Sequence, residues 1–255
     1  MTVLRQVNPE TSARADAEEW QLRCDMAAVF RVCARLEMND QIGNHNSLML
    51  PGSASRFLIN PRGMLFQELR ASDLITCDLD GKVLAGKGEL RKVAFHIHAR
   101  IHLKHPQARC VLHVHPIYTT ALSLVEGGRL ELAHQANLLL NDRIAYDDVN
   151  NGPVHDNEEG DRIASLLGAK TILIMASHGV TVVGQTVHGA FDELYCVERN
   201  AMYQVTAMQI GRPLRRQDEA LRRNYNGPWE NRVDARMHLD AWRRILDREE
   251  PDYAS

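Results

Sequence analysis

Hydrophobic positions recur along this chain with two different periods, which separate expected helices from expected strands. Between residues 17 and 38 apolar side chains recur every three to four residues, and this spacing predicts an amphipathic helix. Residues 92–104 and 187–210 follow the same helical spacing. Residues 110–115 and 171–177 are instead short apolar runs of the kind that forms buried strands. The pattern therefore predicts that helices and strands alternate along the chain.

Turn signals and weaker patterns place the remaining elements. Asp80-Gly81 is a strong hairpin turn, so the flanking residues 74–78 and 82–85 are expected to pair as strands. Further strands are expected over residues 47–50, 56–59, 143–146 and 180–183, and further helices over 119–125 and 157–167.

The order of these elements indicates a single α/β domain over residues 1–255, with a central sheet covered by helices. Residues 1–16 are polar and are expected to form a loose N-terminus. The charged residues 213–255 are expected to form a helical C-terminal tail, interrupted at Asn226-Gly227-Pro228. No internal repeat or low-complexity linker divides the sequence.

Composition and charge narrow the possible classes of function. The net charge of −3 gives no electrostatic reason for binding nucleic acid or an anionic membrane. No apolar run approaches the roughly 18 residues of a membrane span, and the N-terminus lacks a secretory signal pattern. Five widely spaced cysteines without a CxxC pair favour a reducing compartment. We therefore expect a cytoplasmic protein that acts on a small molecule, without nucleic acid or membrane as partner.

The most specific chemical pattern is His113-Val114-His115 at the end of a buried strand. Alternate side chains of a strand share one face, so both imidazoles point the same way. A third candidate, His178, ends the apolar run 171–177 and is followed by Gly179, which allows a sharp turn. Three imidazoles that converge from two strand ends predict a metal site with an open coordination position, an arrangement typical of catalysis.

The candidate metal ligands are therefore His113, His115 and His178. Zinc is the expected divalent metal for three imidazoles, while manganese, cobalt and iron(II) remain open. A cation in such a site polarises a carbonyl or alkoxide oxygen of the substrate.

Several blocks of sequence occur together in a recognisable order. They are Asn44-His45-Asn46-Ser47-Leu48, Ile59-Asn60-Pro61-Arg62-Gly63, the HxH strand Val111–Pro116, Ser177-His178-Gly179 followed by Val183-Gly184, and the helix from Ala190 to Glu198. With these blocks, the chain from about Ala17 to Ala207 resembles the class II aldolase/adducin family. The resemblance implies an α/β fold in the form of a three-layer α/β/α sandwich with a central, mostly antiparallel sheet. It also implies a homotetramer with active sites between subunits.

The resemblance further implies which residues bind substrate. His45, Ser47, Asn60 and Gly63 would line a pocket for an anionic substrate group. The family usually has a histidine where His98 stands. This histidine is either a further substrate contact or a buried side chain beside the site.

The resemblance leaves the proton-transfer groups open. The family's aldolases place a metal-neighbouring glutamate shortly before the HxH block, and the matching position here is Ala94. The nearest carboxylate, Glu89, is either a catalytic base or a solvated loop residue. The aldolases' general-acid tyrosine falls on His134, which is either a catalytic acid or base or a loop histidine bonded to backbone. These departures bring the chain nearer to the adducin-like bacterial branch of the family.

The expected function is that of a divalent-metal-dependent lyase. Its substrate would be a small metal-chelating hydroxy or keto acid, or a sugar-derived compound, cleaved by retro-aldol chemistry or decarboxylated. Decarboxylation needs an electron sink but no base to start it, so the missing glutamate leaves that reaction open. Two alternatives are a mononuclear non-heme iron oxygenase on the same fold and a non-catalytic, adducin-like interaction module.

Overall fold

An eight-stranded sheet forms the centre of the computed structural model, which describes residues 9–131, 133–140, 142–218, 220 and 234–255. Its strands lie in the order β4-β3-β2-β1-β5-β8-β7-β6. Neighbouring strands are antiparallel except β6 and β7, so the expected mostly antiparallel sheet is confirmed. The strands are β1 (His45–Met49), β2 (Arg56–Ile59), β3 (Ile75–Asp78), β4 (Val83–Ala85), β5 (Cys110–Val114), β6 (Ile144–Asp147), β7 (Ile172–Met175) and β8 (Gly179–Gly184).

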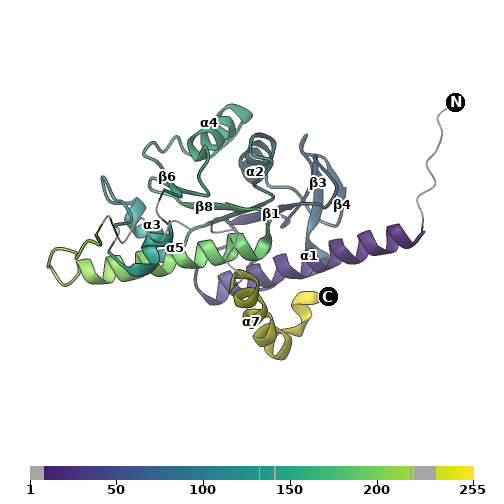
Figure 1. Ribbon diagram of the computed structural model, residues 1–255. Coiled ribbons are helices and arrows are strands. Elements are labelled where there is room, and N and C mark those ends of the chain that lie inside the picture. The colour runs from purple at the N-terminus through teal and green to yellow at the C-terminus, as the bar shows by residue number, and fades with distance from the viewer. Residues whose placement is uncertain (1–8, 132, 141, 219, 221–233) are drawn as a thin grey trace.

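Helices cover both faces of this sheet, which confirms the α/β/α sandwich (Figure 1). Helices α2 and α4 pack together on one face, while α1, α3 and α5 cover the other and α7 packs outside α1 and α5. The helices are α1 (Pro9–Arg35), α2 (Lys92–Lys104), α3 (Ile117–Ser123), α4 (Asn157–Leu167), α5 (Val187–Met208) and α7 (Asp234–Glu249), with short 3-10 helices η1 (Ala71–Asp73), η2 (Gln135–Leu140) and η4 (Pro251–Ala254).

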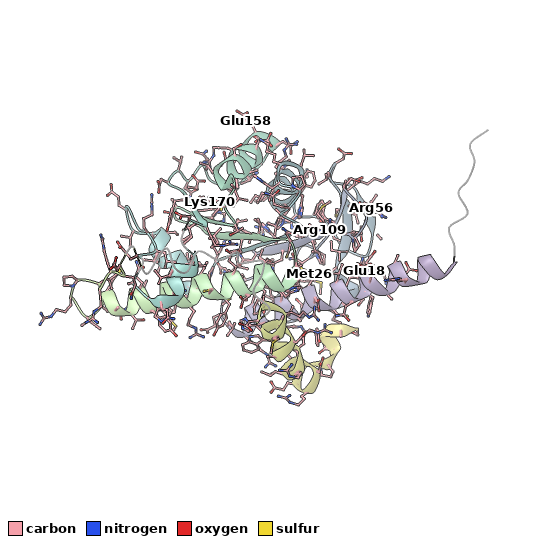
Figure 2. All side chains as sticks on the ribbon, in the orientation of Figure 1. Glu18, Met26, Arg56, Arg109, Glu158 and Lys170 are labelled. Carbon is pink, nitrogen blue, oxygen red and sulfur yellow. The ribbon has the colours of Figure 1, made fainter. Side chains whose placement is uncertain are left out.

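The alternation of side chains along β5 decides which layer each residue faces. Leu112 and Val114 join the apolar core under α1 and α5, whereas Val111 joins the core under α2 and α4. His113 therefore shares the face of Val111. Figure 2 draws the side chains of both helical layers, and Glu158 marks the outer side of α4. The central strand thus delivers a histidine to the α2 side of the sheet.

Both ends of the chain differ in part from expectation. Helix α1 begins at Pro9 rather than at Ala17, so residues 9–16 are helical and not loose. Figure 1 shows these first turns projecting away from the sheet, where no apolar face is needed. In the tail, residues 213–218 carry no regular structure and α7 is helical as expected. Residues 1–8 and the expected break at residues 226–228 lie outside the described residues.

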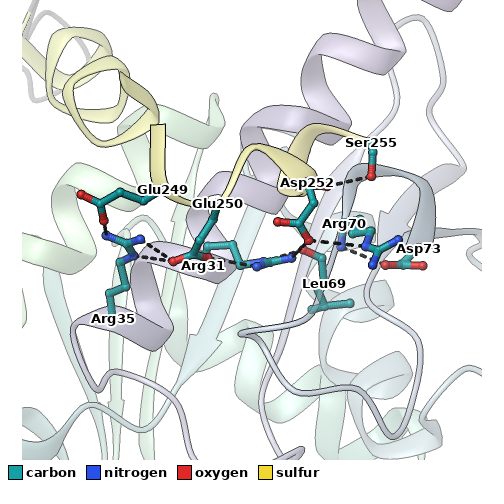
Figure 3. Close-up of polar contacts among 9 residues, drawn as sticks. All are labelled: Arg31, Arg35, Leu69, Arg70, Asp73, Glu249, Glu250, Asp252 and Ser255. Atoms are coloured by element: carbon teal, nitrogen blue, oxygen red, sulfur yellow. Dashed lines mark hydrogen bonds and ion pairs between the residues drawn. The ribbon is translucent and has the colours of Figure 1, made fainter. Parts of the chain in front are cut away.

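The C-terminal residues dock on α1 (Figure 3). Arg31 of α1 forms ion pairs of 2.9 Å with both Glu250 and Asp252, and Arg35 adds a second pair with Glu250. Tyr253 is completely buried in the same core as α1 and α5. The end of the chain therefore completes the apolar layer on the sheet face opposite to α2.

Candidate metal centre

Three histidines converge at the end of β5. His113 lies in β5, His115 follows that strand directly, and His178 lies in the turn between β7 and β8. The ring centroids of His113 and His115 are 5.2 Å apart, and each lies 4.8 Å from the centroid of His178. One nitrogen from each ring lies within 4.8 Å of the others, so the group could hold a metal ion. The structure thus brings together the three histidines singled out from the sequence.

The turn before β8 brings His178 close to β5. Ser177 adopts a left-handed backbone conformation with φ of 53°, and its amide donates to the carbonyl oxygen of Ser123 at 3.0 Å. Gly179 follows His178 and leaves room for the neighbouring strand. A Cβ atom at Gly179 would lie 2.5 Å from Cδ2 of His115 and 2.6 Å from the carbonyl oxygen of Val114. The close approach of the two strand ends therefore requires glycine at this position.

His113 is held by both neighbouring strands. Its Nδ1 lies 3.0 Å from Oγ1 of Thr181, the residue that faces it across β5 and β8. Its backbone amide donates to Oδ1 of Asn46 at 3.1 Å. The contact with Thr181 occupies Nδ1 and leaves Nε2 for a cation. A hydrogen bond to the second ring nitrogen is the usual way in which proteins orient a metal-binding histidine.

The two ring nitrogens of His115 have different surroundings. Its Nδ1 lies 3.7 Å from a carboxylate oxygen of Asp40, so the two groups can interact. Its Nε2 is buried and has no hydrogen-bond partner among the described residues. A buried polar atom without a partner is costly, and a metal ion would satisfy it. The three imidazoles therefore fit a divalent cation that prefers nitrogen ligands.

Burial keeps the three imidazoles neutral. Desolvation lowers the pKa of His113 well below its usual range and that of His178 to about 4. It also lowers the pKa of His115, although the Asp40 carboxylate opposes the shift. Because a metal binds only the neutral imidazole, these side chains are in the ligand-competent form near neutral pH.

The histidines open onto a cavity of about 300 Å³, which His45, Arg91 and Asn150 also line. A second cavity of about 600 Å³ lies beside it and shares Gly43, Arg91 and Val93 with the first. Its further lining includes Arg62 and Lys92. We call the cavity beside the histidines the inner cavity and its neighbour the outer cavity. Together they are large enough for a small organic substrate next to the candidate metal centre.

Comparison with known proteins decides the family. The family described as "Class II Aldolase and Adducin N-terminal domain" matches residues 24–205. The chain belongs to the class II aldolase and adducin family. A provisionally named class 2 aldolase protein of Caulobacter vibrioides is 35% identical over 243 residues, which cover 92% of this chain and 93% of that protein. Alpha-adducin of Mus musculus is 32% identical over 195 residues, which cover 75% of this chain and 26% of alpha-adducin.

Structural comparison agrees with this membership. The crystal structure of an aldolase II superfamily protein from Pseudomonas syringae superposes with a TM-score of 0.86 and 28% identity, covering 98% of each chain. Within the part of the chain that the structure describes, no helix is both long and apolar enough to cross a membrane.

In this member of the class II aldolase and adducin family, the sequence block Asn44–Leu48 lies beside the inner cavity. His45 lines the cavity and stacks on His113, with ring centroids 4.8 Å apart. Its Nδ1 bonds Nε2 of His98 at 2.8 Å, and Ser47 bonds the other ring nitrogen of His98. His98 is completely buried, so it supports His45 and does not reach the cavity as a substrate contact.

Asn60 and Gly63 from the second block have different surroundings. Asn60 accepts from the amide of Asn46 at 3.1 Å and donates to the carbonyl oxygen of Asn44 at 3.2 Å. It therefore braces the residues around His45 and does not border either cavity. Gly63 is exposed, with φ of 89°, and forms a turn outside the cavity lining.

The structure does not bring the two proton-transfer candidates into the inner cavity beside the three histidines. The side chain of Glu89 is 83% exposed at the edge of the outer cavity, 3.9 Å from Arg62. His134 lies against α5, where its Nδ1 contacts Oδ1 of Asn200 at 3.0 Å. Ala94, at the place of the family glutamate, is buried in α2. Residue counts across loops therefore did not locate a carboxylate or an acid beside the three histidines.

Sequence reasoning also missed the residues that hold the metal ligands. Thr181 contacts His113, Asp40 contacts His115, and Asn46 bonds the backbone of His113. These three residues come from β8, the loop before β1, and β1 itself. Only the pairing of distant strands brings them to β5. The single available signal was that Thr181 is a polar residue inside the apolar strand β8.

Proposed function

We propose that this protein is a divalent-metal-dependent lyase acting on a small hydroxy or keto acid, or on a sugar-derived substrate with the same chelating group. The observation that carries the proposal is the buried, unpartnered Nε2 of His115 among three converging imidazoles. Family membership supports it, because a relative similar over nearly the full chain bears the name of a class 2 aldolase.

His113, His115 and His178 would hold the cation, with zinc first and manganese, cobalt or iron(II) as alternatives. When bound, the metal would supply Lewis acidity toward a carbonyl or hydroxyl oxygen of the substrate. Thr181 and Asp40 orient the ligands by contacts with their second ring nitrogens. These contacts would hold the rings of His113 and His115 in place for the cation.

Three cationic side chains support an acidic substrate. Arg91 borders both cavities, and Arg62 and Lys92 line the outer one. They outnumber the two carboxylates there, Asp40 and Glu89. Arg91 is the N-cap of α2, so the positive end of the helix dipole faces the same region. A carboxylate or phosphate group of the substrate would be bound here while its other end approaches the three histidines.

The supply of protons distinguishes the possible lyase reactions. Among the described residues that line the inner cavity, none is Asp or Glu. Decarboxylation of a chelating acid does not need a base at its first step, so it agrees with this lining. Retro-aldol cleavage would need a base such as Glu89 after a loop movement. It could also use His134 of a neighbouring subunit in a homotetramer.

The test is a turnover screen of the full-length protein reconstituted with zinc, manganese or cobalt. Hydroxy and keto acids are incubated with it, and release of aldehyde or carbon dioxide is followed by NMR. We expect product from the wild-type chain and from a His96→Ala control, and none from a His113→Ala/His115→Ala variant. Uptake of dioxygen by the iron-loaded protein would support an oxygenase and contradict the assignment as a lyase. Metal binding without turnover of any acid would favour an adducin-like interaction module.

A further inference from the structure

A continuous hydrogen-bond chain runs through the α2 layer to the edge of the inner cavity. It starts at the carbonyl oxygen of Ala108, which lies 2.8 Å from Nδ1 of His102. Nε2 of His102 lies 2.7 Å from Oγ of Ser47, and the same oxygen bonds Nδ1 of His98. Nε2 of His98 lies 2.8 Å from Nδ1 of His45. Every member between Ala108 and His45 is a side chain that can either donate or accept.

The first acceptor in this hydrogen-bond chain, the carbonyl oxygen of Ala108, fixes the direction of every following hydrogen bond. A carbonyl oxygen only accepts, so Nδ1 of His102 must carry a proton. In a neutral imidazole the other nitrogen then accepts, so the Ser47 hydroxyl donates to Nε2 of His102. That hydroxyl has a single proton, so Oγ accepts from Nδ1–H of His98. Nε2 of His98 is left as an acceptor for Nδ1–H of His45.

This direction of the hydrogen bonds requires neutral rings, and burial provides them. Desolvation lowers the pKa of His102 to about 4. It lowers the pKa of His98 well below the usual range of a histidine. His45 is buried as well, and its ring forms no ion pair with a carboxylate among the described residues. A charged imidazole has protons on both nitrogens, so a charge on His102 or His98 would reverse every hydrogen bond that follows it toward His45.

We infer that His102 and Ser47 act as positioning residues that fix His45 in the tautomer with a proton on Nδ1 and a bare Nε2 at the inner cavity. Nε2 lies on the ring edge directed away from His98, and it forms no hydrogen bond with another described residue. His45 lines the cavity together with the three candidate ligands, but only those three bring nitrogens close enough to share one ion. His45 therefore offers a hydrogen-bond acceptor and not a fourth ligand.

This inference rests on the proposed function where it concerns substrate. A bare imidazole nitrogen attracts a hydroxyl or another donor and repels the lone pairs of a carbonyl or carboxylate oxygen. The inner cavity would thus prefer a substrate whose group beside His45 is a hydroxyl. The carboxylate of a hydroxy acid would be bound by Arg91, which lines the same cavity as His45. The hydrogen-bond chain gives the site a polarity that its residue types alone do not specify.

The direct test is a long-range 1H–15N correlation spectrum of the full-length, 15N-labelled protein at neutral pH, because bare and protonated ring nitrogens resonate in separate regions. The His45 signals are assigned by their loss in a His45→Asn variant. We expect the wild-type protein to have a protonated Nδ1 and a bare Nε2 at His45. A protonated Nε2 at His45 in the wild-type protein would overturn the inference.

Variants then test whether the hydrogen bonds, and not packing alone, set the tautomer of His45. Ser47→Ala should move the His98 and His45 nitrogen signals toward averages of the two tautomers, and Ser47→Thr should restore them. His96→Gln, on the same helix but outside the chain, should leave them unchanged. Unaltered His45 signals in folded Ser47→Ala protein would contradict the inference. The metal content of the same samples reports on the proposed function separately, since the tautomer does not depend on catalysis.

Discussion

Gly179 lies directly against His115. A Cβ atom on Gly179 would lie 2.5 Å from Cδ2 of the His115 ring, and the backbone of Val114 leaves no alternative space. The turn that carries His178 therefore reaches β5 only because the residue after it has no side chain. The spacing of the two metal-binding segments depends on this contact.

Gly179→Ala should consequently weaken metal binding as well as the fold. The added methyl group must push the His115 ring out of its position, and displaced ligands typically cost about 10–100-fold in metal affinity. Overpacking should lower the free energy of unfolding by about 1–3 kcal/mol. Zinc affinity measured by competition with a chromogenic chelator checks the first effect. Gly189→Ala in α5 is the matched control, and equal zinc affinity in both variants would contradict the account.

Thr181→Val should show whether Thr181 orients the His113 ring for metal binding. The substitution keeps the shape of the side chain but removes the oxygen 3.0 Å from Nδ1 of His113. We expect a loss of about 10–100-fold in zinc affinity because the ring loses the contact that orients it. Thr181→Ser keeps the hydroxyl and should retain affinity near the wild-type value. Zinc affinity of Thr181→Val within a factor of about two of wild type would show that the contact has no orienting role.

The buried histidines should make the metal-free protein unstable in mild acid. The folded-state pKa of His45 is about 3 and that of His102 about 4, both below the ordinary value of 6.5. At pH values between the folded-state and ordinary pKa, the unfolded chain binds more protons than the folded chain. The contribution of these histidines to the free energy of unfolding is therefore fully present above pH 6.5 and is lost as the pH falls. Each such histidine can remove up to about 1.4 kcal/mol per pH unit. Urea unfolding with a chelator present, between about pH 7 and about pH 5, measures the slope. A flat profile would contradict the neutral histidine chain.

The docking of the C-terminal residues on α1 predicts that Tyr253, far from the candidate metal centre, contributes strongly to the free energy of unfolding. Tyr253 is completely buried, and its hydroxyl donates to Asp247 at 2.8 Å. Tyr253→Ala should lower the free energy of unfolding by about 3–5 kcal/mol, as for other large aromatic truncations. Tyr253→Phe should cost about 1 kcal/mol through the lost hydrogen bonds. Urea denaturation measures both values. A loss below about 1 kcal/mol in Tyr253→Ala would contradict a structural role for the end of the chain.

The three histidines of the candidate metal centre could be singled out from the sequence because the signals that mark them are local. The alternation of a strand places His113 and His115 together, and the glycine after His178 indicates the turn that brings it near. The apolar runs predicted the strands, and the three-to-four-residue spacing predicted the helices, for the same reason. Local periodicity records which face of an element is buried, so it is readable without knowledge of the neighbouring elements.

The contacts around those ligands could not be predicted, because they depend on strand order and loop paths. Thr181 faces His113 only through the pairing of β5 with β8. The hydrogen-bond chain from His102 to His45 needs α2 packed on β1, which no local pattern specifies. Helix α1 begins at Pro9, and an amphipathic pattern cannot detect a helical segment that has no apolar stripe.

The central claim is that His113, His115 and His178 bind a metal ion, and metal content tests it most directly. Plasma mass spectrometry on protein purified without a histidine tag or chelator should find about one divalent metal ion per chain. The His113→Ala/His115→Ala variant should lose the metal, and His96→Ala should keep it. If the wild-type protein binds no zinc, manganese, cobalt or iron even after reconstitution, or if the double variant retains the metal, the three histidines are not a metal centre.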